Sequence, residues 1–314
     1  MDAITTGDRN TAIGYGAGGA LTVATDCVFV GRQAGLATTE GTNSTFVGSD
    51  AGAAVTTGLR NTMIGAAGWQ FDAENDNLGI GHNALAGAIA GGGYNVAIGN
   101  YAGDALTSGD SNVFIGYQAG SGNTTGQRGV AIGYQAMDSA ATSSTGNICI
   151  GYHAGRAIDS GEYNCFIGYT TGQSNTTGSA NVGVGQGCLP NPDTESNNIA
   201  IGMDTLAGSI AGGEYNIAIG RQSLDALTSA DYCTAVGYQA GTNIAASDGQ
   251  NTLMGYQAGT VITTGGYNTI IGSQADTGQN DANYNTLVGV LATASGNGHQ
   301  IVICLLYTSD AADE

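Results

Sequence analysis

The residues best suited to chemistry in this 314-residue chain are three histidines and six cysteines. The histidines are His82, His153 and His299, and the cysteines are Cys27, Cys149, Cys165, Cys188, Cys233 and Cys304. No two cysteines show a CxxC or other metal-type spacing. In the repeat described below, His82 and His153 lie about 19 Å apart, too far to share a metal or a catalytic triad. The sequence therefore predicts no catalytic, cofactor-binding or metal-binding residues, and we expect a protein that is not an enzyme.

The strongly negative net charge of the chain limits the kinds of molecule that it can bind. The chain has no lysine, only 6 arginines against 25 acidic residues, and a formal net charge of −19. Nucleic acids and anionic membrane surfaces are bound by clustered Lys and Arg, which are missing here. No apolar run is long enough to span a membrane, and MDAITTGDRN does not begin a secretory signal. The sequence therefore predicts neither nucleic-acid binding nor membrane insertion.

A short phrase returns along the whole chain about every seventeen residues. NVFIGYQAG at 112–120 reappears as NTAIGYGAG at 10–18, NICIGYHAG at 147–155 and NTLMGYQAG at 251–259. We number each repeat from the glycine of its IG or VG pair, which is position 0. These glycines are Gly14, Gly31, Gly48, Gly65, Gly81, Gly99, Gly116, Gly133, Gly151, Gly168, Gly185, Gly202, Gly220, Gly237, Gly255, Gly272 and Gly289. So regular a period is typical of a solenoid, whose units cannot bury a core alone.

The columns of this alignment predict one strand in each coil. Position −1 is Ile, Val or Met, position −3 is β-branched in fifteen of seventeen repeats, position −4 is mostly Asn, and position +3 is always small. β-Branched residues two apart favour a strand rather than a helix. We therefore expect an all-β parallel β-solenoid of about 17 coils of about 17 residues. The side chains at −1 and −3 would point inward against +3, and a weaker second strand would lie near +3 to +8.

Position −2 must then face outward, opposite to −1 and −3. It carries no charged or hydroxyl residue in any repeat. An exposed apolar stripe of this kind indicates a buried partner surface, and another copy of the chain is the simplest partner. The sequence therefore predicts a homo-oligomer whose interface includes Phe29, Phe46, Met63, Phe114, Phe166, Leu253, Ile270 and Leu287.

Tyrosine is the most patterned polar residue. Seven of the fifteen tyrosines lie at +1 and six at −5. Tyr117, Tyr134, Tyr152 and Tyr169 occupy four consecutive coils and are predicted to form an exposed aromatic ladder. Such a ladder either stabilises a corner of the coil or binds a glycan, and the sequence leaves both interpretations open.

At NTAIGYGAG and its copies the chain resembles the head repeats of trimeric autotransporter adhesins and related repeats of phage tail fibres. The resemblance covers about residues 5–290. It implies left-handed parallel β-rolls that assemble as homotrimers, an extracellular location on a virion tail or a bacterial surface, and attachment to a host glycan or protein. We therefore expect an adhesive or structural rod. A purely structural spacer and an ice-binding solenoid, suggested by repeated Thr pairs, remain alternatives.

The last residues break the pattern. CLLYTSDAADE at 304–314 is unlike every repeat and resembles a translated sequencing adapter. We therefore predict that residues 1–303 form a single β-solenoid domain, and that 304–314 are not native but mark a fragment assembled from environmental DNA.

Overall fold

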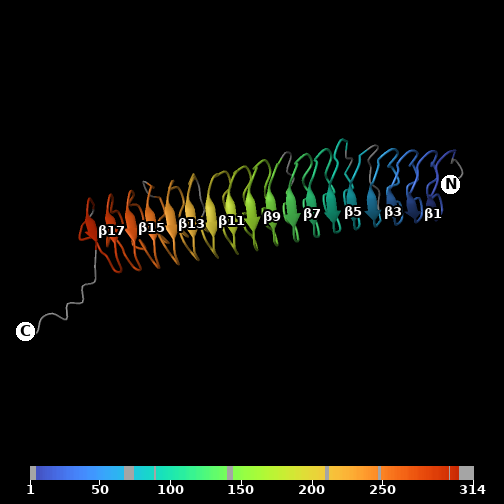
Figure 1. Ribbon diagram of the computed structural model, residues 1–314. Coiled ribbons are helices and arrows are strands. Elements are labelled where there is room, and N and C mark those ends of the chain that lie inside the picture. Colours follow the sequence, from blue (N-terminus) through green and yellow to red (C-terminus); the bar gives the residue numbers. More distant parts are fainter. Residues whose placement is uncertain are drawn as a thin grey trace, which may run out of the picture. The chain divides into compact units, whose positions relative to one another are not determined.

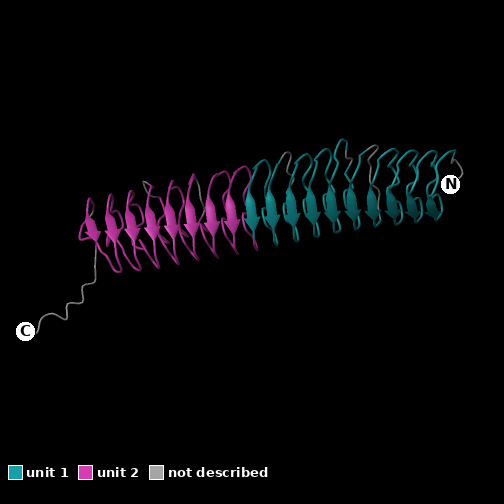
Figure 2. Cartoon of the chain, in the orientation of Figure 1, with its two compact units in different colours: residues 1–167 teal, residues 168–314 magenta. Residues whose placement is uncertain are grey.

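The computed structural model describes residues 5–66, 74–87, 90–139, 144–208, 212–246, 249–296 and 298–303. Over these ranges the chain is a parallel β-solenoid without helices. Two compact units are distinguished, residues 1–167 and 168–314 (Figure 2). A single domain over 1–303 stays a prediction, as does the left-handed sense, and residues 304–314 lie outside the described part.

Every coil contributes one three-residue strand at positions −3 to −1, as predicted, and Figure 1 shows that within each unit the strands follow one another in chain order. An additional strand, β18, was not predicted from the repeat. The first unit contains β1 (Thr11–Ile13), β2 (Val28–Val30), β3 (Thr45–Val47), β4 (Thr62–Ile64), β5 (Leu78–Ile80), β6 (Val96–Ile98), β7 (Val113–Ile115), β8 (Val130–Ile132), β9 (Ile148–Ile150) and β10 (Cys165–Ile167). The second contains β11 (Val182–Val184), β12 (Ile199–Ile201), β13 (Ile217–Ile219), β14 (Thr234–Val236), β15 (Thr252–Met254), β16 (Thr269–Ile271), β17 (Thr286–Val288) and β18 (Ile301–Ile303).

Within each unit, consecutive strands pair in parallel and in strict register. Phe114 at −2 of β7 pairs with Ala131 at −2 of β8, and Leu253 in β15 pairs with Ile270 in β16. Because side chains alternate across a strand, this register stacks each column of the repeat on itself.

The side chains at −2 point into the coil, and the predicted direction was wrong. Phe29, Phe46, Met63, Phe114, Phe166, Leu253, Ile270 and Leu287 are all fully buried within the chain. They therefore cannot form the predicted oligomer interface. The residues at −3 and −1 face outward instead, and the burial pattern of β7 alternates accordingly.

The asparagine at −4 explains this direction. Asn95 donates from Nδ2 to the carbonyl of Gly109 at 2.9 Å across its coil, and its Oδ1 accepts the backbone N–H of Asn112 at 2.9 Å. These bonds satisfy a buried amide only if position −4 faces inward. Position −2 has the same parity as −4, so it must face inward as well.

The segment after the glycine turns instead of forming the predicted second strand. Gln118 at +2 has φ 53° and Gly120 at +4 has φ 63°, both in the left-handed region. A strand cannot hold such residues at alternate positions. No strand occurs over +3 to +8 in the described coils, although backbone bonds such as Gly120 N–H to Ala136 O, at 2.9 Å, still join neighbouring coils.

Candidate interaction surface

The outward side chains at −3 and −1 form a continuous apolar surface in each unit, which we call the strand face. In the first unit it contains Ile or Val at every −1 position, and Thr, Val, Leu, Ile or Cys165 at −3. Ile64 is 42% exposed and Ile148 is 38% exposed. Large aliphatic side chains, repeated in consecutive strands, are thus in contact with solvent in the isolated chain.

The strand face carries no charge, although the protein is strongly acidic. None of the 25 acidic residues and none of the 6 arginines stands at −3 or −1. At the chain's average frequency of 25 acidic residues in 314, the 34 positions at −3 and −1 would contain about three carboxylates. Depletion of charge over an exposed apolar patch is characteristic of the core of a protein interface.

Two exposed columns, at −5 and +1, border the strand face. In the −5 column, Asp26 receives hydrogen bonds from Arg9, with Nε–Oδ1 at 2.6 Å, and Asp76 receives them from Arg60 at 2.6 Å. These guanidinium groups lower the pKa of both carboxyls below its ordinary value. Each ion pair joins one coil to the next at the edge of the face.

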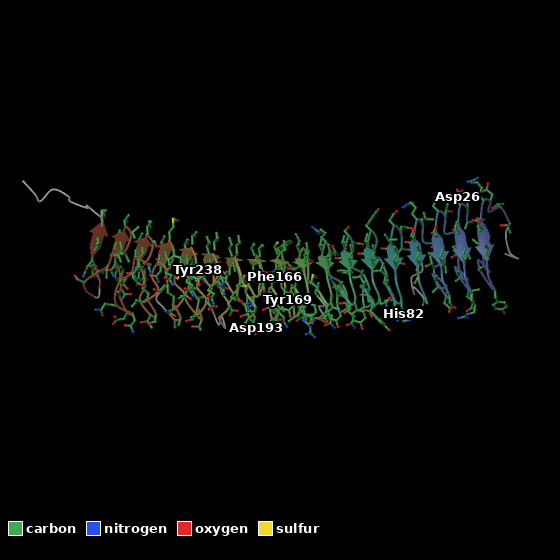
Figure 3. The ribbon with its side chains drawn as sticks, turned by 90° about the horizontal axis from the view of Figure 1, so that it is seen from below. Asp26, His82, Phe166, Tyr169, Asp193 and Tyr238 are labelled. Atoms are coloured by element: carbon green, nitrogen blue, oxygen red, sulfur yellow. The ribbon has the colours of Figure 1, made fainter. Side chains whose placement is uncertain are left out.

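The predicted aromatic ladder lies in the +1 column. Tyr117 and Tyr134 are stacked with ring centroids 5.4 Å apart, and Tyr134 and Tyr152 with centroids 5.3 Å apart. All three are exposed, which confirms an exposed ladder there. Tyr169, labelled in Figure 3, is also exposed and lies at the start of the second unit. Because the stacked rings cover one another's faces, mainly their edges and hydroxyls remain for a ligand.

A chain of polar side chains at +2 supports this ladder. Gln135 donates from Nε2 to Gln118 Oε1 at 2.8 Å, and its own Oε1 lies 2.9 Å from His153 Nε2. The His153 ring stacks on Tyr152 with centroids 3.9 Å apart. Burial, with Arg156 nearby, lowers the pKa of His153. His153 is thus part of the stacked ladder, a role that its spacing in the sequence did not reveal.

Four of the five described cysteines lack the lowered pKa of a reactive thiol. Burial raises the thiol pKa of Cys27, Cys149, Cys165 and Cys188, whereas a reactive cysteine needs a lowered one. Among the described residues, no group of three or more His, Cys, Asp or Glu side chains is placed to hold a metal ion. Cys304 lies outside the described part.

A shallow cavity of about 380 Å³ in the first unit is lined by residues of three consecutive coils: Glu74, Asn75, Gly91 to Gly93, Tyr94 and Asp110. Its carboxylates hold the loop: Glu74 Oε1 accepts from the Gly91 N–H, and Asp110 Oδ1 from the Gly93 N–H, both at 2.8 Å. These contacts give both acids a structural role.

Within the described ranges, no helix has the length and apolar character needed to cross a membrane. No protein-family model matches the chain, and no curated protein matches it either.

Proposed function

We propose that the protein is the non-enzymatic adhesive or structural rod of a phage tail fibre or a bacterial surface adhesin, that it assembles as a homotrimer through its strand faces, and that it mediates attachment to a host or surface. Its location would be extracellular, and its receptor a host cell-surface glycan or protein. The observation that carries the proposal is the exposed, uncharged strand face on an otherwise acidic chain.

The size of this face suits a stable assembly. Ten strands of the first unit, spaced by about 4.8 Å, and a width of about 20 Å from −5 to +1 give roughly 850 Å² per copy, which a three-fold ring divides between two neighbours, and the strands of the second unit add further area. A specific protein–protein interface buries about 800 Å² on each partner. Burying aliphatic side chains at −3 and −1 supplies the main driving force.

Assembly would also explain how weak contacts give firm attachment. Three copies on one axis present each surface three times, so every later contact forms at a high effective concentration. The stacked tyrosines favour a structural role for the ladder, because their faces are already used. We therefore place the receptor contacts outside the ladder and the strand face.

The ice-binding alternative needs a flat array of free hydroxyls. The Thr hydroxyls of several turns are already bonded within the chain: Thr22 donates to Thr39 O at 3.1 Å, and Thr107 to Thr124 O at 2.9 Å. These bonds favour a structural role for the Thr pairs. A thermal-hysteresis assay separates the two functions, since an attachment rod is expected to show none.

The test of assembly is the mass of the protein in solution, measured by light scattering coupled to size-exclusion chromatography. We expect the mass of three chains for the wild type. Val113→Glu together with Ile115→Glu places two charges on the strand face at β7 and should give monomers with an unchanged circular dichroism spectrum. The matched control is Val23→Glu, because Val23 is 43% exposed but lies in a turn away from the strand face.

A stable wild-type monomer would overturn the assembly. Attachment is tested by binding of labelled protein to a glycan array and to immobilised host-surface proteins. The assembled wild type should bind and the monomeric double variant should lose most of that binding. Equal binding by both forms would reject the multivalent mechanism, and no binding by either would favour a purely structural spacer.

A further inference from the structure

We infer that a gap in the −5 column of the second unit is a carbohydrate site, which holds one neutral pyranose ring between the side chains of Tyr232 and Tyr267. The inference rests on the proposed attachment to a host surface, and it adds the chemical class of the receptor and the place where the receptor binds. All residues of the site come from one chain.

The −5 column of the second unit contains two aromatic stacks with one interruption between them. The rings of Tyr215 and Tyr232 are stacked with centroids 5.1 Å apart. Two coils further along, the rings of Tyr267 and Tyr284 are stacked with centroids 4.8 Å apart. Gln250 stands at −5 in the coil that separates the two stacks. A single non-aromatic residue thus divides a column that is otherwise tyrosine over five consecutive coils.

The interruption leaves two ring faces uncovered. Tyr215 covers one face of Tyr232, so the other face of Tyr232 is turned towards the coil of Gln250. The uncovered face of Tyr267 is turned towards the same coil from the opposite side. Two coil spacings of about 4.8 Å separate these faces by about 9.6 Å. Both side chains are accessible, since Tyr232 is 57% exposed and Tyr267 is 38% exposed.

A cavity of about 500 Å³ lies at this interruption, lined by Tyr232, Gln250 and Thr252. Its volume is within the range of small-molecule sites, which combine aromatic walls with a few polar groups. Gln250 is exposed, and its amide can both donate and accept hydrogen bonds, as can the hydroxyl of Thr252. The gap therefore offers aromatic faces and hydrogen-bonding groups in one hollow.

The spacing of the two faces favours a sugar over a flat aromatic ring. Carbon atoms in contact lie about 3.5–4.0 Å apart, so a planar ring needs only about 7–8 Å between two faces. A puckered pyranose chair with its axial hydrogens needs more. A β-linked glucose or N-acetylglucosamine unit has only equatorial substituents and thus presents C–H groups to both tyrosines. The axial hydroxyl of mannose would instead point at one of the two rings.

The charges around the cavity favour a neutral sugar. The second unit contains one arginine, Arg221, which stands at +1, on the other edge of the strand face. A carboxylated or sulfated sugar would therefore lack a guanidinium partner at the cavity. It would also meet the carboxylate of Asp231, which directly precedes Tyr232 in the chain, and like charges repel.

Saturation-transfer difference NMR on the full chain tests the site, with cellotetraose and chitotetraose as probes. Irradiation of the tyrosine ring protons should saturate both faces of a bound unit: the protons on C1, C3 and C5 on one side, and those on C2 and C4 on the other. Tyr232→Leu removes one aromatic face and should weaken binding about ten-fold. A mannotetraose probe should not bind.

Gln250→Tyr fills the gap with a ring and is the sharpest variant. Tyr232 and Tyr267 adopt φ 57° and 61° at the same position, and Gln250 has φ 57°, so the backbone already suits a tyrosine. The circular dichroism spectrum should stay unchanged while binding of both probes falls at least about ten-fold. Saturation of only one face of the sugar, or equal binding by Gln250→Tyr, would overturn the site.

The matched control is Tyr238→Leu. Tyr238, labelled in Figure 3, belongs to the same coil as Tyr232 and is also stacked on one other tyrosine, but it stands at +1. Its replacement should leave binding unchanged, and a loss as large as that of Tyr232→Leu would contradict the assignment to the −5 column.

The monomeric variant Val113→Glu with Ile115→Glu separates the site from the assembly. It should bind the short probes with wild-type affinity, because one chain forms the whole site. Binding by the monomer alone would show that assembly covers the cavity and would reject it as a receptor contact. If neither form binds the probes, the carbohydrate site is rejected, while binding of the wild type to other glycans or to immobilised host proteins would leave the proposed attachment standing.

Discussion

The ring of Phe114 occupies the space where Gly120 would carry a side chain. A Cβ atom on Gly120 would lie 2.5 Å from Cδ1 of Phe114, and Gly120 has φ 63°. Some coils with a small residue at −2 show the reverse: Ala131 is accompanied by Met137 at +4, and Met137 adopts φ 50° while remaining buried. The −2 and +4 side chains of a coil thus share one volume.

This shared volume predicts strong coupling between the two positions. Phe114→Ala should lower the free energy of unfolding by about 3–5 kcal/mol through a cavity, and Gly120→Met should lower it by about 1–3 kcal/mol through overpacking. The double variant reproduces the pair found at Ala131 and Met137, so it should lose at least about 1 kcal/mol less than the sum. Denaturant unfolding of all four proteins measures the coupling. Additive losses would contradict the shared volume.

Most of the architecture could be predicted because the period and the β-branched columns are visible in one sequence. Those columns could not settle which side of the strand faces the core, because position −2 and its neighbours at −3 and −1 are all largely apolar. Two signals were available: the recurrent asparagine at −4, which shares parity with −2, and the reciprocal sizes of −2 and +4 in some coils, as in Phe114 with Gly120 and Ala131 with Met137. An oligomer interface tolerates varied sizes, whereas a closed coil requires compensation.

The candidate surface was predicted only in part. The tyrosine ladder could be predicted because tyrosine recurs at +1 in consecutive coils, and the stacking of the coils places these rings against one another. The participation of His153 could not be foreseen, because it depends on a hydrogen bond between His153 and Gln135 of the neighbouring coil. The exposed face was predicted at position −2 instead of at −3 and −1, because all three positions carry apolar residues.

A buried asparagine in the first unit offers a stabilising substitution. Asn123 is fully buried at +7; its Oδ1 accepts the Gly126 N–H at 2.8 Å, but its Nδ2 has no hydrogen-bond partner. Leu106 fills the same position in the preceding coil. Asn123→Leu should raise the free energy of unfolding by about 1 kcal/mol, because removing the unsatisfied Nδ2 donor and burying a leucine side chain together outweigh the acceptor that the Gly126 N–H loses.

The matched control for that substitution is Asn95→Leu. Asn95 is equally buried, yet both ends of its amide are bonded. We expect a loss of about 1–3 kcal/mol there. Thermal or denaturant unfolding measures both variants, and a change of the same sign at both sites would refute the argument.

Two aspartates should respond to pH in opposite directions. Burial raises the pKa of Asp104 in the folded chain, so its ionisation costs stability as the pH rises above about 4, the ordinary value. Asp104→Asn should therefore stabilise the protein at neutral pH, and this gain should disappear in acid.

The hydrogen bond from Arg9 lowers the pKa of Asp26. The contribution of Asp26 to the stability of the fold is therefore present above about pH 4 and is lost as the pH falls through the lowered pKa. Asp26→Asn should therefore destabilise slightly at neutral pH only. Unfolding curves across the pH range check both signs.

Cys165 provides a native probe of the assembly. It stands at −3 of β10, on the strand face, whereas Cys149 at −2 of β9 is buried inside the coil. In a parallel three-fold ring, the three copies bring their Cys165 thiols to one level near the axis. Two of them can form a disulfide and the third is left without a partner, so mild oxidation should convert at most about two thirds of the chains into covalent dimers.

Burial raises the pKa of the Cys165 thiol, so the oxidation should be slow near neutral pH and faster in alkali. Non-reducing electrophoresis measures the yield, and Cys165→Ser should give none. Complete conversion to dimers would indicate a two-fold assembly, and the absence of any cross-link in an oligomeric protein would place Cys165 away from the axis.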